Sequence, residues 1–346
     1  MLKKIIVILL PILIIGSGIY FYTHQKKIIV PENSAIKAIP IDASFIIESH
    51  KTLPLLKIIS QNCDIWKELT DMPYFTDLNR QYKKLDSIVR EHSELGDILE
   101  NEPLFISAHT SGMNHFNYLF VCSVPSNLQS AIYGFLDSVK GNSPTNNLQY
   151  EETTIHCIQV NDKNAFYYAV SSGTFISSFS PALVKESLRQ LESGISLMNN
   201  AYFTKVLKAS EIQTEANLFV NLQTFANVSS ALFNRAFYST LSSMQGFGQW
   251  MGLDVTINPD EVIMTGFTSC DSTGTQFLNL FQHQSSYEAK AALVAPANTM
   301  FMLCHEFTDY PAFYKSYVKY LGIHNKSRSR AEWLSKIEQD YGMNIE

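Results

Sequence analysis

The chain has 346 residues, a length that fits about two domains, and its 46% of apolar residues exclude an intrinsically disordered protein. Residues 1–27 hold four lysines and no acidic residue. The remainder therefore carries 22 basic and 32 acidic side chains and a net charge of −10, compared with −6 for the whole chain. An acidic body argues against nucleic acid as a partner, because nucleic-acid binding requires a cationic surface that neutralises phosphates.

An uncharged and mostly apolar run covers residues 5–22. As a helix, this run would span about 27 Å, close to the roughly 30 Å hydrocarbon core of a bilayer. Lysines flank it on both sides, which is typical of a segment that directs export. The pattern predicts a signal anchor over residues 1–27 that crosses the bacterial inner membrane once and leaves the body in the periplasm.

Two alternatives to the anchor stay open at this point. In one, the segment is a cleaved signal peptide, with the small residues at 16–18 as its cleavage site. In the other, it is a buried core helix. Both the anchor and the signal peptide place residues 28–346 outside the cytoplasmic membrane. The membrane, contacted through residues 5–22, is therefore the first expected partner.

A linker over residues 28–39 is followed by alternating strand and helix patterns. Runs of β-branched and aromatic residues predict strands, and apolar residues three and four apart predict helices. Strands are expected at residues 39–48, 104–109, 117–124, 149–160 with a break near Glu151, 165–171, 174–179, 216–222, 250–257 and 261–269. Helices are expected at residues 51–69, 75–99, 128–139, 181–191, 200–209, 224–244, 276–282, 310–321 and 327–341.

Many of the connections between these strands are too short for parallel crossovers. The predicted fold class is therefore α+β, with a mainly antiparallel sheet packed with amphipathic helices and preceded by one N-terminal transmembrane helix.

Two stretches of the sequence resemble each other. Residues 40–48 read PIDASFIIE and residues 296–304 read PANTMFMLC, and each precedes an apolar helix that contains a proline. Residues 216–221 form a looser third copy. A duplication predicts an extracytoplasmic domain over residues 40–292 and an apparently incomplete second unit over residues 293–346, as in a truncated gene product. The alternative is that any strand followed by a helix gives such a pattern.

A further resemblance rests on several segments taken together. They are the N-terminal anchor, the strand IPIDASFIIES, the segment DIWKEL and the later SAHTSG and NYLFVCSVP. The chain resembles a group of uncharacterised bacterial membrane-anchored envelope proteins that share a domain of unknown function. This resemblance implies an exported, membrane-anchored protein, and it implies no catalytic residues. Members of the group typically run longer than this chain, which agrees with truncation.

Signatures of phosphate-binding loops, nucleophile elbows and zinc helices are absent from the sequence. No cofactor, metal site or enzymatic activity is therefore expected. Five scattered cysteines predict buried free thiols, with a single disulfide as the alternative. One alternative function is that of a hydrolase. Its site would consist of Ser107, His109 and His115, which lie close together on predicted strands and the loop between them. Two histidines across a hairpin are, however, more often ordinary surface or loop residues.

Five aromatic residues crowd one predicted helix at spacings of three and four, namely Tyr310, Phe313, Tyr314, Tyr317 and Tyr320. They form either a stripe that faces the core or a binding face for a lipid, a glycan or a protein partner. The predicted function is a non-enzymatic, membrane-anchored extracytoplasmic protein that binds or scaffolds in the cell envelope. Two alternatives stay open: a carrier of a hydrophobic ligand or lipid, and a hydrolase of unknown substrate.

Overall fold

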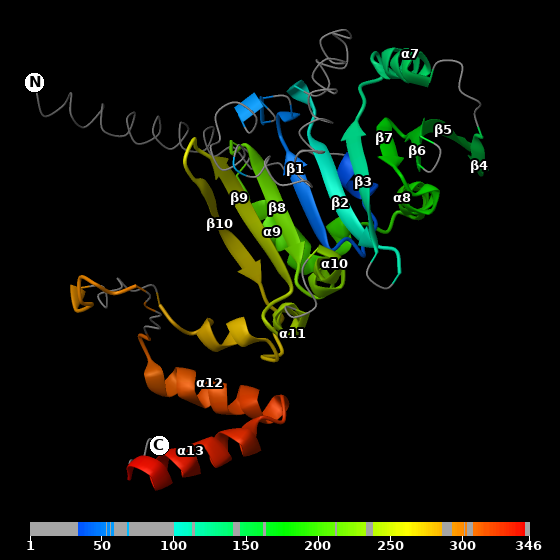
Figure 1. The fold of residues 1–346 in the computed structure, drawn as a ribbon. Coiled ribbons are helices and arrows are strands. Elements are labelled where there is room, and N and C mark those ends of the chain that lie inside the picture. Colours follow the sequence, from blue (N-terminus) through cyan, green and yellow to red (C-terminus); the bar gives the residue numbers. More distant parts are fainter. Residues whose placement is uncertain are drawn as a thin grey trace, which may run out of the picture.

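The computed structural model describes residues 34–52, 54–55, 57–58, 68, 100–112, 115–140, 146–161, 164–211, 213–232, 238–285, 293–300, 302 and 307–342. Within this part of the chain, one antiparallel sheet runs in the order β10-β9-β8-β1-β2-β3-β7-β6-β5-β4, with helices packed against it (Figure 1). The predicted α+β class is confirmed. The expected transmembrane helix falls in residues 5–22, outside the described residues. None of the helices that are described has the length and apolarity needed to cross a bilayer.

The strands are β1 (Phe45–Ser49), β2 (Leu104–Thr110), β3 (Phe116–Ser123), β4 (Leu148–Tyr150), β5 (Thr153–Asn161), β6 (Asn164–Ser171), β7 (Thr174–Ser178), β8 (Ala216–Asn221), β9 (Trp250–Ile257) and β10 (Val262–Ser269). The helices are α2 (Ser34–Lys37), α7 (Gln129–Lys140), α8 (Pro181–Ser193), α9 (Ala201–Ala209), α10 (Phe225–Leu232), α11 (Tyr238–Ser243), α12 (Tyr310–Ile323) and α13 (Ser327–Tyr341). Three short 3₁₀ turns are η1 (Leu197–Asn199), η3 (Met244–Gly246) and η4 (Phe277–Phe281).

Some elements differ from the sequence-based expectation. β1 starts at Phe45 because Pro40 opens a turn, in which the Ala43 N–H donates to the Pro40 carbonyl at 3.1 Å. Within the expected helix 276–282, residues Phe277–Phe281 form the tighter η4, and its start is capped by a hydrogen bond from the Gln276 N–H to Oδ1 of Asn279. The expected helix 224–244 contains α10, α11 and η3, with residues 233–237 outside the described part. Most of the expected helices 51–69 and 75–99 also lies outside it.

β1 and β8 lie side by side and antiparallel, with Ile47 opposite Leu218. From this pair, β2 and β3 continue the sheet on one side, and β9 and β10 continue it on the other. The loosest copy of the sequence repeat is thus the direct neighbour of the first copy. At the copy near residue 296, Pro296 opens the same kind of turn as Pro40, since the Thr299 N–H donates to its carbonyl at 3.0 Å.

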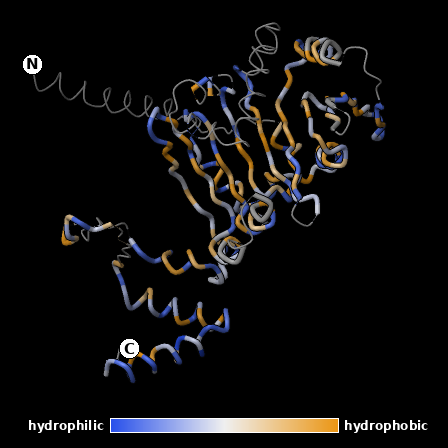
Figure 2. The backbone as a smooth tube through the Cα atoms, in the orientation of Figure 1, coloured by the Kyte–Doolittle hydropathy of each residue, from blue (hydrophilic) through white to orange (hydrophobic). Residues whose placement is uncertain are grey.

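Helices α8 and α9 pack on one face of the sheet, and α7 packs on the other near β3 and β6 (Figure 1). Phe203 of α9 is fully buried and makes edge-on contacts with Phe219 of β8 and Trp250 of β9. Hydrophobic residues recur along the strands, as expected for a sheet covered by helices (Figure 2). Apolar packing around Phe203 thus anchors α9 on the sheet.

The core also contains two of the cysteines. Cys122 and Cys157 are buried and free, as the sequence predicts, and burial raises the pKa of the Cys122 thiol to about 12. Cys270 is a half-buried free thiol. Cys63 and Cys304 lie outside the described residues.

Truncating the aromatic anchor of α9 is expected to destabilise the sheet. Phe203→Ala should lower the free energy of unfolding by about 3–5 kcal/mol, because it removes buried area and leaves a cavity between α9 and two strands. Urea denaturation followed by circular dichroism measures the change. Lys208→Ala, an exposed position on the same helix, should change the value by less than about 0.5 kcal/mol. A loss below about 1 kcal/mol for Phe203→Ala would contradict the packing described.

Candidate functional site

The aromatic residues predicted as a binding face lie on α12, and the structure divides them between two sides. On one side, Phe313 packs against Phe307, with ring centroids 4.1 Å apart, and against Phe281 of η4 at 5.5 Å. Tyr320 meets Phe277 of η4 edge-on at 6.2 Å. This side of the stripe therefore packs within the chain.

The other side of the stripe opens into a groove between α12 and α13 with a volume of about 690 Å³. Trp333 of α13 borders it and is 58% exposed, and Tyr310 of α12 is 56% exposed. The groove is lined by residues Tyr310, Phe313, Tyr314, Tyr317, Leu321, Lys326, Ser329, Arg330, Trp333 and Leu334. Four of the five predicted residues therefore line one concave surface, and Tyr320 is not among them.

Cationic groups border the same groove. The Arg330 guanidinium donates to the Tyr314 hydroxyl at 2.5 Å and lies 5.4 Å from the centre of the Tyr314 ring. Lys326 contributes a second cation, and none of the lining residues carries a carboxylate. The groove thus combines exposed aromatic rings with positive charge, an arrangement suited to a ligand with both apolar and anionic groups.

Ser107 and His109, predicted as hydrolase candidates, lie on β2 and point to the same face because they are two residues apart. His109 Nδ1 lies 2.8 Å from Oδ1 of Asp42, and its Nε2 lies 2.9 Å from Oγ of Ser107. Since a carboxylate only accepts, we assign the imidazole proton to Nδ1 and let the serine hydroxyl donate to Nε2. The hydrogen bond to His109 also lowers the pKa of Asp42. His115 lies exposed on the loop before β3 and is not part of this chain of hydrogen bonds.

The hydrogen bonds run from serine to histidine to aspartate, as in a catalytic triad, but the serine is not accessible to a substrate. Ser107 is fully buried and His109 is 2% exposed, in the interior of a strand paired on both sides. The backbone around Ser107 is engaged in these ladders and is not arranged around an open substrate site. In this geometry the hydrogen bonds tie the Pro40 turn, which carries Asp42, to β2.

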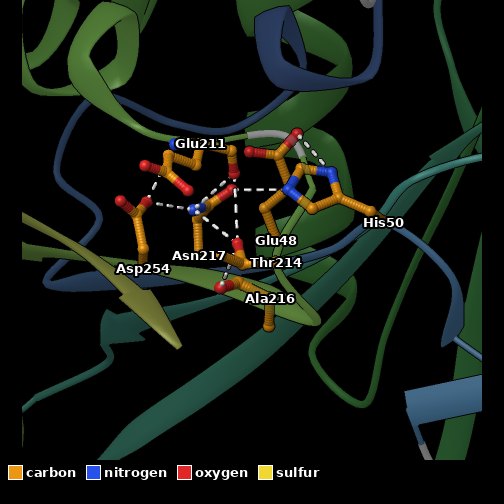
Figure 3. A network of polar contacts seen from close by, with 7 residues as sticks. All are labelled: Glu48, His50, Glu211, Thr214, Ala216, Asn217 and Asp254. Atoms are coloured by element: carbon orange, nitrogen blue, oxygen red, sulfur yellow. Dashed lines mark hydrogen bonds and ion pairs between the residues drawn. The ribbon is translucent and has the colours of Figure 1, made fainter. Parts of the chain in front are cut away.

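A second histidine network lies past the opposite end of β1 (Figure 3). His50 Nε2 lies 2.5 Å from Oδ1 of Asn217, and the Asn217 amide donates to Oδ1 of Asp254 at 2.7 Å. The Glu211 N–H donates to the same Asp254 oxygen at 3.0 Å. The amide oxygen of Asn217 can only accept, so His50 carries its proton on Nε2 and turns its unprotonated Nδ1 toward Glu48 Oε1, 3.8 Å away.

The strand register brings these residues together. Glu48 of β1 pairs with Asn217 of β8, and Asn217 pairs with Asp254 of β9, so three polar side chains stand in one row on the same face. Burial raises the pKa of Glu48 to about 7 and lowers the pKa of His50. A carboxylic acid that titrates near neutral pH thus faces a neutral imidazole.

His50 also lines a cleft of about 450 Å³. Lys51, Pro54 and Leu55 form part of one wall, and Thr214 and Glu215 form part of the other. Buried acid–base pairs beside a cleft are candidates for proton transfer. Sequence reasoning missed this pair. The available signal was a polar residue at an inward-facing position of each apolar strand.

Comparison with known proteins adds no assignment: no family model, no curated protein and no solved structure matches the chain. The resemblance to membrane-anchored envelope proteins therefore stays a prediction. Within the described residues, no group of three or more histidine, cysteine or acidic side chains is placed to hold a metal ion.

The buried Ser107 predicts how the chain reacts with a serine-directed probe. A fluorophosphonate should leave the native chain unlabelled, because the hydroxyl is fully buried within the sheet. Labelling is read by fluorescence after gel electrophoresis, with Ser107→Ala as the matched control. A signal in the native chain that disappears in Ser107→Ala would instead support the hydrolase alternative.

The raised pKa of Glu48 predicts a pH-dependent stability. Its pKa in the folded chain, about 7, exceeds the usual 4.5, so the folded state binds the proton more tightly. Glu48 should therefore contribute a fall of about 3 kcal/mol in the free energy of unfolding as the pH rises from about 4.5 to about 7, whereas the lowered pKa of His50 contributes a rise. Glu48→Gln should remove this part of the slope in urea titrations at several pH values.

The exposed Lys208 provides a control for the same titrations, and Lys208→Ala should keep the slope of the native chain because it leaves Glu48 in place. An unchanged slope in Glu48→Gln would show that Glu48 ionises as freely in the folded chain as in the unfolded chain.

Proposed function

We propose that this protein is a non-enzymatic binding protein of the bacterial cell envelope. In this proposal, the groove between α12 and α13 binds an acidic, amphipathic peptide segment of a protein partner. The observation that carries the proposal is the convergence of Tyr314, Arg330 and Trp333 around one exposed groove. Tyrosine, arginine and tryptophan are the residue types most enriched where binding energy concentrates in protein interfaces.

The chemistry of the groove favours a peptide over a neutral glycan. A neutral sugar offers no negative charge to the two cations of the lining, Lys326 and Arg330. Donors of this kind fit a carboxylate, and the exposed Tyr310 and Trp333 rings fit apolar side chains next to it. A volume of about 690 Å³ accommodates a few side chains of a helix or extended segment.

The proposed location rests on the sequence. The apolar residues 5–22 with flanking lysines would tether the chain to the inner membrane and place the body in the periplasm. In that position, the groove would meet segments of other envelope proteins. A protein partner and the membrane are thus the two proposed contacts of the chain.

The two alternative functions have weaker support. A carrier of a hydrophobic ligand needs space beneath β5, β6 and β7, where Ile155, Ala169 and Ile176 pack in one core with Leu183 and Leu188 of α8. A hydrolase needs substrate access to Ser107, which is fully buried. Both functions therefore have less support from the structure than the binding of a peptide segment.

Site-specific photo-crosslinking in intact cells tests the proposal. A benzoylphenylalanine at position 333 of the full chain should yield one protein adduct, whereas the same group at the exposed Tyr341 should not. Mass spectrometry should place the crosslink in a segment of the partner that contains both acidic and apolar residues. Adducts with lipid alone, or adducts of equal yield at both positions, would contradict a peptide-binding groove.

Charge reversal supplies the matched control. Arg330→Glu should reduce the adduct roughly tenfold or more, because it places a negative charge where the acidic segment binds. Arg328→Glu should retain the adduct, because the Arg328 side chain is 91% exposed and does not line the groove. Equal loss in both variants would show that the net charge of α13, and not the groove, attracts the partner.

A further inference from the structure

The two edges of the sheet differ in how they resist pairing with another strand. The edge strand β4 has three residues and is followed by the exposed Glu151 and Glu152, with Glu151 in the left-handed region at φ 47°. A short strand, charges and a bend are the usual protection of an edge. These features disfavour the addition of a further strand at β4.

β10, the opposite edge, is longer and carries no charge within the strand, although the exposed Asp260 and Glu261 precede it. Its eight residues, VIMTGFTS, include no charge and no proline, and Met264 and Phe267 are 53% and 64% exposed. Within the part of the chain that the structure describes, β9 is the only strand paired with β10. A long, uncharged edge of this kind is a template for one more strand.

The hydrogen-bond pattern identifies which residues face the free edge. The Asn258 N–H donates to the Glu261 carbonyl at 2.9 Å, so these two residues form a hydrogen-bonded pair of the β9–β10 hairpin. Because such pairs alternate in an antiparallel ladder, the backbone of Thr265 is bonded to β9. The N–H and C=O groups of Met264 and Gly266 point outward and are available to another strand.

From these features, we propose that two copies of this chain join their β10 strands antiparallel around a twofold axis at Thr265. A twofold axis perpendicular to the sheet keeps each face continuous, so residues of the same parity stand opposite each other. In this register, Ile263 lies opposite Phe267 of the second copy, and Met264 lies opposite Gly266. The outward N–H and C=O groups of Met264 and Gly266 then bond across the interface.

The side chains make the second copy the best-fitting occupant. The axis creates two Ile–Phe cross-strand pairs on one face, from Ile263 and Phe267, and aromatic–β-branched pairs stabilise antiparallel sheets. On the other face, Met264 lies opposite Gly266, which presents no side chain because a Cβ there would collide with the Gly252 carbonyl of β9. The Thr265 side chains meet on the axis without charge repulsion. The edge is thus complementary to itself.

Disulfide crosslinking in the full chain tests this register. Thr265 and its copy form a pair without mutual backbone hydrogen bonds, with Cα atoms about 4.5 Å apart, which is within disulfide range. The copies of Thr268 lie about 20 Å apart in the same register. After mild oxidation in membranes, Thr265→Cys should therefore give roughly tenfold more disulfide-linked dimer on a non-reducing gel than Thr268→Cys.

Two further variants separate the interface from the fold. Met264→Pro removes an N–H that faces the free edge, so it should spare the bonds to β9 and abolish the crosslink of Thr265→Cys. Thr265→Lys should shift the detergent-solubilised chain from dimer to monomer in analytical ultracentrifugation, because it opposes like charges on the axis. Equal crosslinking at positions 265 and 268, or a native chain that sediments as a monomer at all concentrations, would overturn the proposal.

Discussion

The arrangement of the whole sheet depends on the two ladders of β1. This strand has only five residues, yet it pairs with β2 along one edge and with β8 along the other. Everything from β2 to β7 is joined to β8, β9 and β10 through it. Ile46, the second residue of β1, is fully buried, so apolar contacts beneath the sheet stabilise the same strand as the backbone hydrogen bonds. Both histidine networks, moreover, lie at the ends of β1.

These networks show two ways of placing polar groups next to a core. One network is a chain of hydrogen bonds that joins Asp42, His109 and Ser107. Asp42 forms its exposed end, with a side chain that is 60% exposed. Glu48, in contrast, gains no partner strong enough to keep it ionised, and its pKa rises accordingly. The turn before β1 thus carries a stabilised carboxylate, Asp42, and the strand itself carries one that favours protonation, Glu48.

Local patterns predicted most of the fold. The adjacent strands at residues 250–257 and 261–269, the break of the strand pattern near Glu151 and the helix that starts at residue 181 all depend on neighbouring residues, and all three are present. The sites depend on distant residues. Asp42 reaches His109 across 67 positions of sequence, and Asp254 joins Asn217 only through strand register.

The groove between α12 and α13 likewise combines residues that a local pattern predicts with residues that only the fold brings close. The spacing on α12 identified Tyr310, Phe313, Tyr314 and Tyr317, whereas Trp333 and Arg330 join them only because α13 folds back beside α12. The helical spacing of the aromatic residues predicts the wall that α12 forms. The wall that α13 forms depends on the turn between the two helices, which this spacing does not reveal.

The separation of β1 from β8 along the chain has a consequence for how the protein is made. His50 and Asn217, which meet at the ends of these strands, are 167 residues apart. A ribosome releases the amino-terminal strand long before its second neighbour exists, and pairings that close such long loops form slowly. Until then, β1 exposes an unpaired apolar edge. Nascent molecules are therefore exposed to aggregation during this interval, and a chaperone that shields residues 45–49 would protect the chain until β8 has been synthesised.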